Sequence, residues 1–152
     1  MTPGQWLLLI TSALSIYGVG QVWLVQLSSY RLWAYVGEHE FGAYHVVWWR
    51  SIWGVVLGPA VLVFIGTALM LRWHGPGIPQ WCLWLGFGLQ IGLVLGTAAW
   101  WGPLMADIQA PDGGLSPERY HLLMTTHWLR VAIITAHGLL LCWMLARSVQ
   151  GA

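Results

Sequence analysis

Residues 126–145 read THWLRVAIITAHGLLLCWML, and this stretch decides the fold. It is almost wholly apolar and has the length, about 20 residues, that a helix needs to cross the hydrocarbon core of a bilayer. Three polar side chains nevertheless lie inside it, at His127, Arg130 and His137. An arginine at the centre of a membrane helix costs at least about 2.5 kcal/mol and faces a bundle interior or a wet cavity. The stretch therefore predicts a membrane helix with an inward-facing polar stripe.

Helical geometry places the three polar residues on one side of this helix. With a turn of about 100° per residue, Arg130 and His137 lie about 20° apart, and His127 lies about 60° from Arg130. A rise of about 1.5 Å per residue puts His137 about 15 Å deeper than His127. We expect such a stripe to line the interior of a helical bundle.

The composition excludes a water-soluble domain. Of 152 residues, 58% are hydrophobic and 7% are charged, whereas a soluble domain carries about 25% charged residues. The 13 tryptophans are typical of segments that meet the membrane–water interface. The basic residues are scattered and form no patch that could hold phosphates. We therefore expect one integral membrane domain, with the lipid bilayer as its partner and no nucleic-acid partner.

Four apolar stretches have the length of a membrane span. They cover residues 5–27, 46–71, 81–104 and 122–146. In lipid every backbone polar group must be paired internally, which favours helices for these stretches. The sequence thus predicts an all-α membrane protein with four transmembrane helices in an antiparallel bundle, forming a single domain over residues 1–152.

The connectors between the spans differ in character. Residues 73–80 are short and rich in Gly and Pro, which is typical of a tight turn. Residues 28–45 form a longer, polar first connector, whose later half is predicted to be an interfacial helix that runs into the second span. Ser116 followed by Pro117 is typical of a helix start, so the fourth helix is expected to begin there. Glycine at every fourth position predicts close helix packing in the third span, at Gly88, Gly92 and Gly96.

An even number of spans places both termini and the 73–80 turn on one side of the membrane. Basic residues mark the cytoplasmic side. The terminal side carries Arg72 and Arg147, and the other side carries Arg31, Arg50 and Arg119. Because Arg31 and Arg50 are treated as candidate site residues and not as orientation signals, we expect the termini in the cytoplasm.

Polar residues of two other spans are expected to meet the stripe near the longer connectors. A run of residues around His45 recurs at a spacing of three or four, and so shares one helix face; it comprises Glu38, Phe41, His45, Trp49 and Ile52. In the third span, Gln90, Thr97 and Trp101 share a face. The candidate catalytic residues are His45, His127 and Arg130. Candidate pocket residues are Glu38, Trp49, Trp101 and His137.

Four interpretations of this polar cluster remain open. It is a set of interhelical hydrogen bonds, or a pocket in which a histidine base works beside an arginine that stabilises an anion. Alternatively, His45, His127 and a carboxylate hold a metal, or His45 or His137 ligates a haem or pigment. The residues assign neither a metal-ligand set nor a cofactor.

Two segments resemble a known family. Residues 30–59 are similar to the first-loop and second-helix pattern of small bacterial four-helix membrane proteins related to the anthrone-oxygenase-like family. The matching positions are Tyr30, Val36-Gly37, Phe41, Tyr44-His45, Arg50 and Pro59. The closing helix matches at Thr126 to Arg130 and at Ile134 to His137. The family has Pro, Asn and Arg where this chain has Arg31, His127 and His137, and its His after Pro-Leu is Met105 here.

The resemblance implies a location and an activity. The location is the bacterial inner membrane, as a multi-pass protein of the cell membrane. The activity is the cofactor-independent oxidation of an apolar aromatic or quinone-type molecule by O₂, with His45 or His127 as base and Arg130 holding the enolate. It also adds Tyr44 and Trp128 to the candidate pocket. The alternative function is a non-enzymatic small subunit of a larger membrane complex, packing against helices, lipids, haem or pigments.

Overall fold

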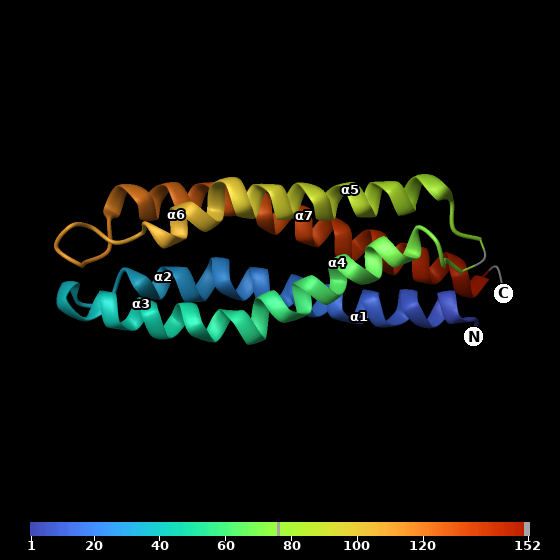
Figure 1. Cartoon of the computed structure of the whole chain (residues 1–152), viewed down its shortest axis with the longest axis horizontal. Coiled ribbons are helices and arrows are strands. Elements are labelled where there is room, and N and C mark those ends of the chain that lie inside the picture. Colours follow the sequence, from blue (N-terminus) through green and yellow to red (C-terminus); the bar gives the residue numbers. More distant parts are fainter. Residues whose placement is uncertain (76, 151–152) are drawn as a thin grey trace.

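Four long helical segments make up this protein. The computed structural model describes residues 1–75 and 77–150. Each of the four segments is long and apolar enough to cross a membrane, and they span Pro3–Trp33, Glu38–Met70, Gln80–Ala106 and Pro117–Gln150. Both termini lie at the same end as the turn that joins the second and third segments (Figure 1). The predicted all-α bundle of four transmembrane helices is confirmed.

Short π-helical segments interrupt three of the four spans. The elements in chain order are α1 (Pro3–Leu24), η1 (Val25–Ser29), α2 (Tyr30–Trp33), α3 (Glu38–Ile52), η2 (Trp53–Leu57), α4 (Gly58–Met70), α5 (Gln80–Gly96), η3 (Thr97–Trp101), α6 (Gly102–Ala106) and α7 (Pro117–Gln150). The later half of the first connector is helical and continues into the second span, as predicted. Its earlier half continues the first span, so that only residues 34–37 join the two helices.

Local sequence signals explain where two spans begin. The Thr2 hydroxyl accepts a hydrogen bond from the Gln5 N–H at 3.3 Å, and the Gln5 side chain accepts one from the Thr2 N–H at 2.8 Å. This reciprocal capping box satisfies donors that a helix start leaves unpaired. The last span begins at Pro117, as predicted, because the fixed backbone angle of proline suits the first helical position.

Glycine–proline pairs follow two of the π-helical segments. Proline has no N–H to donate within a helix. In both pairs the N–H of the glycine before the proline instead donates to the carbonyl five residues earlier in the chain. Gly58 N–H donates to the Trp53 carbonyl, and Gly102 N–H donates to the Thr97 carbonyl. Such wide turns occur frequently at functional sites.

The backbone carbonyl of Val55 accepts hydrogen bonds from side chains of another helix. Val55 lies four residues before Pro59, so its carbonyl lacks the usual helical donor. Gln21 Nε2 donates to the Val55 oxygen at 2.8 Å and Tyr17 Oη donates to it at 3.2 Å. Side chains of α1 therefore meet a hydrogen-bonding demand that lipid cannot meet.

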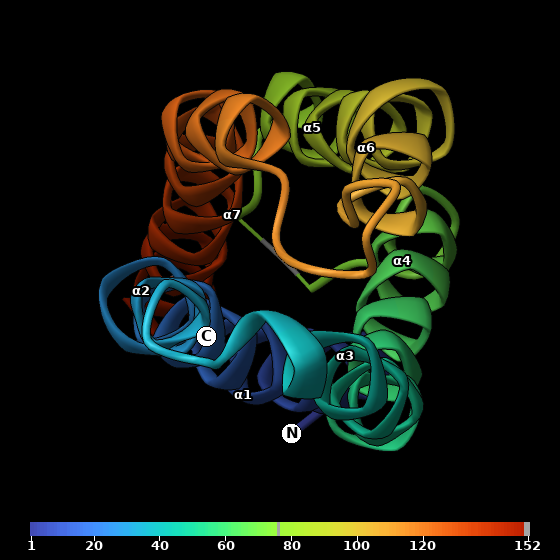
Figure 2. The same ribbon diagram turned by 90° about the vertical axis from the view of Figure 1, so that its left-hand side faces the viewer.

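The four spans form a ring of neighbours. α1 packs against both α7 and α4, and α5 packs against the same two helices. A view along the bundle shows the four spans arranged in a ring, with the connector before α7 crossing one end of the bundle (Figure 2). Ile108 anchors this connector and is fully buried. Gly113 supplies a left-handed turn in it, with φ of +91°, which glycine adopts without a steric penalty.

Two apolar cores lie at opposite ends of the bundle. The core near the termini is built from Leu8, Met70, Ile78, Cys82, Leu83, Leu141 and Met144. The core near the longer connectors is mainly aromatic and comprises Tyr30, Trp33, Phe41, Trp101, Met105, Ile108 and Leu123. The space between these two cores holds the buried polar residues described below.

Close helix packing depends on different glycines from those predicted. A Cβ at Gly88 or Gly92 would meet nothing within 4 Å, and the nearest atoms to one at Gly96 would belong to Trp101 of the same span, so the prediction that these glycines pack tightly against other helices is wrong within this chain. A Cβ at Gly138 would lie 2.7 Å from Val19, and one at Gly66 would overlap Thr11. Glycine thus permits close contact of α1 with α7 and with α4.

We expect Gly66→Val to lower the stability of the bundle by about 1–3 kcal/mol, as overpacking does in well-packed cores, because the new side chain collides with Thr11. Gly88→Val is the matched control, since that position opens onto free space. Thermal unfolding of both variants in detergent measures the difference. Equal losses in the two variants would contradict close packing at Gly66.

Candidate functional site

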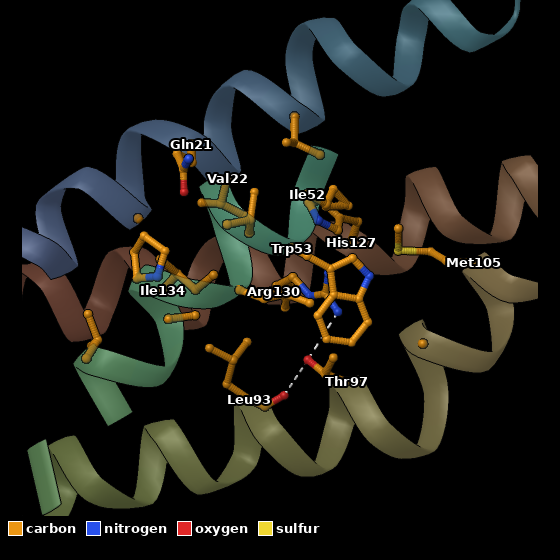
Figure 3. Close-up of a pocket in the computed structure, with 18 of the residues that line it drawn as sticks. Gln21, Val22, Ile52, Trp53, Leu93, Thr97, Met105, His127, Arg130 and Ile134 are labelled. Atoms are coloured by element: carbon orange, nitrogen blue, oxygen red, sulfur yellow. Dashed lines mark hydrogen bonds between the residues drawn. The ribbon is translucent and has the colours of Figure 1, made fainter. Parts of the chain in front are cut away.

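A cavity of about 300 Å³ lies between the two cores and draws its lining from all four spans. Its walls are mostly apolar, and polar groups enter at few points (Figure 3). All three π-helical segments contribute to the lining, through Val25, Trp53 and Thr97 among others. A cavity of this size with a few convergent polar groups is typical of a small-molecule site.

Arg130 enters the cavity from α7. Its Nη2 donates to Thr97 Oγ1 at 3.1 Å, and Thr97 in turn donates to the Leu93 carbonyl at 2.7 Å. The guanidinium carbon lies 4.6 Å from the ring centre of Trp101, within the range of a cation–π contact. The Nε atom of Arg130 is buried and has no hydrogen-bond partner in the described part of the chain.

The charge of Arg130 has no counter-charge in the cavity wall. Each of the five carboxylates of the chain sits at an exposed position, and the cavity lining contains none of them. A buried charge without a partner is energetically costly, because the low-dielectric interior does not screen that charge. The cavity is therefore suited to a ligand that brings an oxygen to this guanidinium.

His127, one turn before Arg130, also lines the cavity. Gln26 is fully buried, and its Nε2 donates to the Met124 carbonyl at 3.1 Å. This bond orients the amide so that Gln26 Oε1 accepts a hydrogen bond from His127 Nδ1 at 2.7 Å. In a neutral ring the proton then sits on Nδ1, and Nε2 keeps a free lone pair.

His137 lies at the deep end of the cavity and is held on both sides. The Thr67 hydroxyl donates to the Val63 carbonyl at 2.8 Å, so it accepts from His137 Nε2 at 3.2 Å. Ser15 Oγ then donates to His137 Nδ1 at 3.0 Å. His137 thereby joins α1, α4 and α7, as expected for interhelical hydrogen bonding, and neither nitrogen is free to ligate a metal or a haem.

His45 does not lie with His127 and Arg130. It is buried in the aromatic core near the connectors, stacked on Phe41 and Trp48 with ring centres 5.8 and 6.1 Å away. Its Nδ1 is 3.4 Å from Gln109 Nε2, and its Nε2 is buried without a partner in the described residues. The cavity lining does not include it.

The other predicted pocket residues divide into two groups. Trp49 lines the cavity, and Trp101 is buried beneath the Arg130 guanidinium. Glu38 is exposed, and Tyr44 packs against the aromatic core. Trp128 is 43% exposed and meets Trp23 edge to face on the outer surface, at 5.7 Å between ring centres.

The metal interpretation finds no geometry to support it. Across residues 1–75 and 77–150, no three His, Cys, Asp or Glu side chains lie close enough to hold an ion. The two histidines that this interpretation paired contact different rings, since His45 contacts Trp33 and His127 contacts Tyr30.

Sequence reasoning identifies Gln26 as a residue of the first span that could reach a partner, but it misses Ser15 and Thr67, which orient His137. Ser15 and Thr67 are small and uncharged, so they do not stand out beside Arg130. A signal was nevertheless present in the first span. Gln5, Ser15 and Gln26 recur every ten or eleven residues, which is about three helical turns. Polar residues at that spacing follow one face of a helix.

Comparisons with known proteins add no relative. No family model matches the chain, and neither the curated proteins nor the solved structures yield a match. The chemistry of the site therefore rests on its own residues.

We expect the two cavity histidines to hold opposite tautomers, with the proton on Nδ1 of His127 and on Nε2 of His137. The reason is that Gln26 offers an acceptor to the first ring and Thr67 offers one to the second. Nitrogen-15 NMR of histidine-labelled protein distinguishes the tautomers, and loss of a signal in His127→Asn or His137→Asn assigns it. The same tautomer in both rings would contradict these networks.

Proposed function

We propose that this protein binds an apolar aromatic or quinone-type molecule between its four spans, and that it acts on an aromatic molecule with an acidic proton by removing that proton. The observation that carries the proposal is the pairing of one proton acceptor, His127, with one cation, Arg130, in a cavity with apolar and aromatic walls. A base and an anion-stabilising cation, held together in an apolar cavity, are the parts that proton abstraction needs.

The roles of the two residues follow from their contacts. Gln26 leaves His127 Nε2 as a lone pair on a ring that lines the cavity, so His127 is the base. Arg130 is held by Thr97 and Trp101 and holds the oxyanion that forms. Trp49 and Trp53 offer aromatic faces to the bound rings.

The resemblance to the anthrone-oxygenase-like family supports oxidation as the next step. In that reaction a methylene group and O₂ become a carbonyl group and one molecule of water, so that no further reductant is needed. Loss of the proton leaves its electron pair on the bound molecule, and the resulting carbanion passes electrons to O₂. Arg130 stabilises the negative charge while this happens.

The fold indicates a membrane location but does not identify which membrane. The protein is a multi-pass membrane protein by the length and apolar character of its helices, and we propose the bacterial inner membrane. Arg31 and Arg50 are exposed and lie outside the cavity lining, so they count as orientation signals after all. With both counted, the longer connectors carry three arginines and the terminal side carries two, so the positive-inside rule favours the longer connectors in the cytoplasm, and the expected cytoplasmic position of the termini loses its support.

We expect Arg130→Leu to abolish binding of an aromatic probe while the protein stays inserted and folded, because the guanidinium has no charged partner whose loss would destabilise the bundle. Arg147→Leu is the matched control on the same helix, since Arg147 also lies over a tryptophan, Trp143, at 5.7 Å. Calorimetric titration with 2-naphthol and a thermal unfolding curve measure both effects. Unfolding of Arg130→Leu would favour a structural role, and unchanged binding would contradict the proposed site.

We expect the purified protein to consume O₂ when anthrone is added, with one molecule of O₂ used for each anthrone, and to show no absorption band of haem or pigment. An oxygen electrode and an absorption spectrum measure these. A stoichiometric haem or pigment band, or co-purification of other membrane subunits in fixed ratio without oxygen uptake, would favour the non-enzymatic subunit.

A further inference from the structure

The hydrogen-bonding pattern at the polar end of the cavity is more specific than its charge. His127 and Arg130 are three residues apart on α7, which places their side chains side by side on one helix face. His127 presents a lone pair, because Gln26 occupies its Nδ1–H. Arg130 has only donors. His127 and Arg130 together therefore offer one acceptor and one group of donors at this end of the cavity.

Few oxygen groups satisfy both partners at once. A hydroxyl donates its proton to a lone pair and accepts from a guanidinium with the same oxygen. A carbonyl accepts from the guanidinium but faces the histidine lone pair with lone pairs of its own. An apolar substituent leaves both protein groups unpaired in an apolar chamber, which costs the desolvation of each group.

We infer that the site recognises a hydroxyl on the aromatic ring, and that Gln26 is the residue that sets this preference by fixing the tautomer of His127. This rests on the proposed function and narrows it. The bound form is the phenol, or the enol tautomer of a ketone such as anthrone, and not the ketone itself or a quinone. The proton that His127 receives comes from the O–H group, whose electron pair stays on the oxygen as the oxyanion beside Arg130.

Gln26 is a positioning residue, since it acts through His127 and is not in the cavity lining. Its full burial and its bond to the Met124 carbonyl hold the amide in one orientation. Without that amide, His127 is free to place its proton on Nε2 and to present a donor to the cavity. The preference for a hydroxyl over a carbonyl then disappears.

The test compares three naphthalenes by calorimetric titration into the protein in lipid nanodiscs, with empty nanodiscs as the blank. They are 2-naphthol, 2-naphthaldehyde and 2-methylnaphthalene. We expect the wild-type protein to bind 2-naphthol about tenfold more tightly than either of the others. In Gln26→Met, the affinities for 2-naphthol and 2-naphthaldehyde should differ by no more than about twofold.

Gln5→Met is the matched control, because Gln5 also donates from α1 to an α7 carbonyl, at Ser148, but lies outside the cavity. It should keep the wild-type order of affinities. Equal or tighter binding of 2-naphthaldehyde by the wild type overturns the inference but leaves aromatic binding standing. Failure of all three probes to bind overturns the proposed function and this inference with it. Should Gln26→Met not fold, the wild-type comparison still decides the preference for a hydroxyl, and nitrogen-15 NMR of the wild type decides the role of Gln26, which a proton on Nε2 of His127 would overturn.

Discussion

The structure depends on one constraint: within a bilayer, each backbone N–H and C=O group needs a partner inside the protein. A regular α-helix meets this constraint most simply, but the glycine–proline pairs at residues 58–59 and 102–103 interrupt the helical hydrogen bonds, since proline has no N–H to donate. The chain responds with wide turns before each pair and with side chains of α1 that reach the Val55 carbonyl. These departures from regular helix border the cavity. The space that a ligand would fill is thus built from the same irregularities that the constraint forces on the backbone.

In lipid the hydrophobic effect does not drive helices together, so helix association depends more on shape complementarity and on polar contacts. Glycine sets the distance of α1 from α4 and α7. Hydrogen bonds of His137 join three spans, while those of Gln26 reach α7. The structural interpretation of the polar stripe therefore fits His137, which joins helices, whereas His127 and Arg130 face the cavity, and their catalytic role stays a proposal.

The sequence predicts the spans well because apolar length is a local property. It also predicts the inward stripe of α7, where 3.6-residue periodicity is unbroken from Pro117 onward. It does not place His45, because His45 and Trp49 share a helix face, yet His45 stacks within the aromatic core and only Trp49 reaches the cavity. It does not separate the roles of Gln21 and Gln26 either. The first reaches the second span and the second reaches α7, a difference that only the arrangement of helices decides.

The polar bonds between α1 and α7 also have a collective consequence. Gln5 contacts Ser148, Ser15 contacts His137 and Gln26 contacts His127. Residue numbers thus increase along the first span as the numbers of their partners decrease along α7. Together they define the antiparallel register of the two helices over nearly their whole length. A slip of even one residue would separate all three pairs at once, and it would also release the ring that Gln26 orients. The same few residues therefore determine both the alignment of the first and last spans and the protonation pattern of the site.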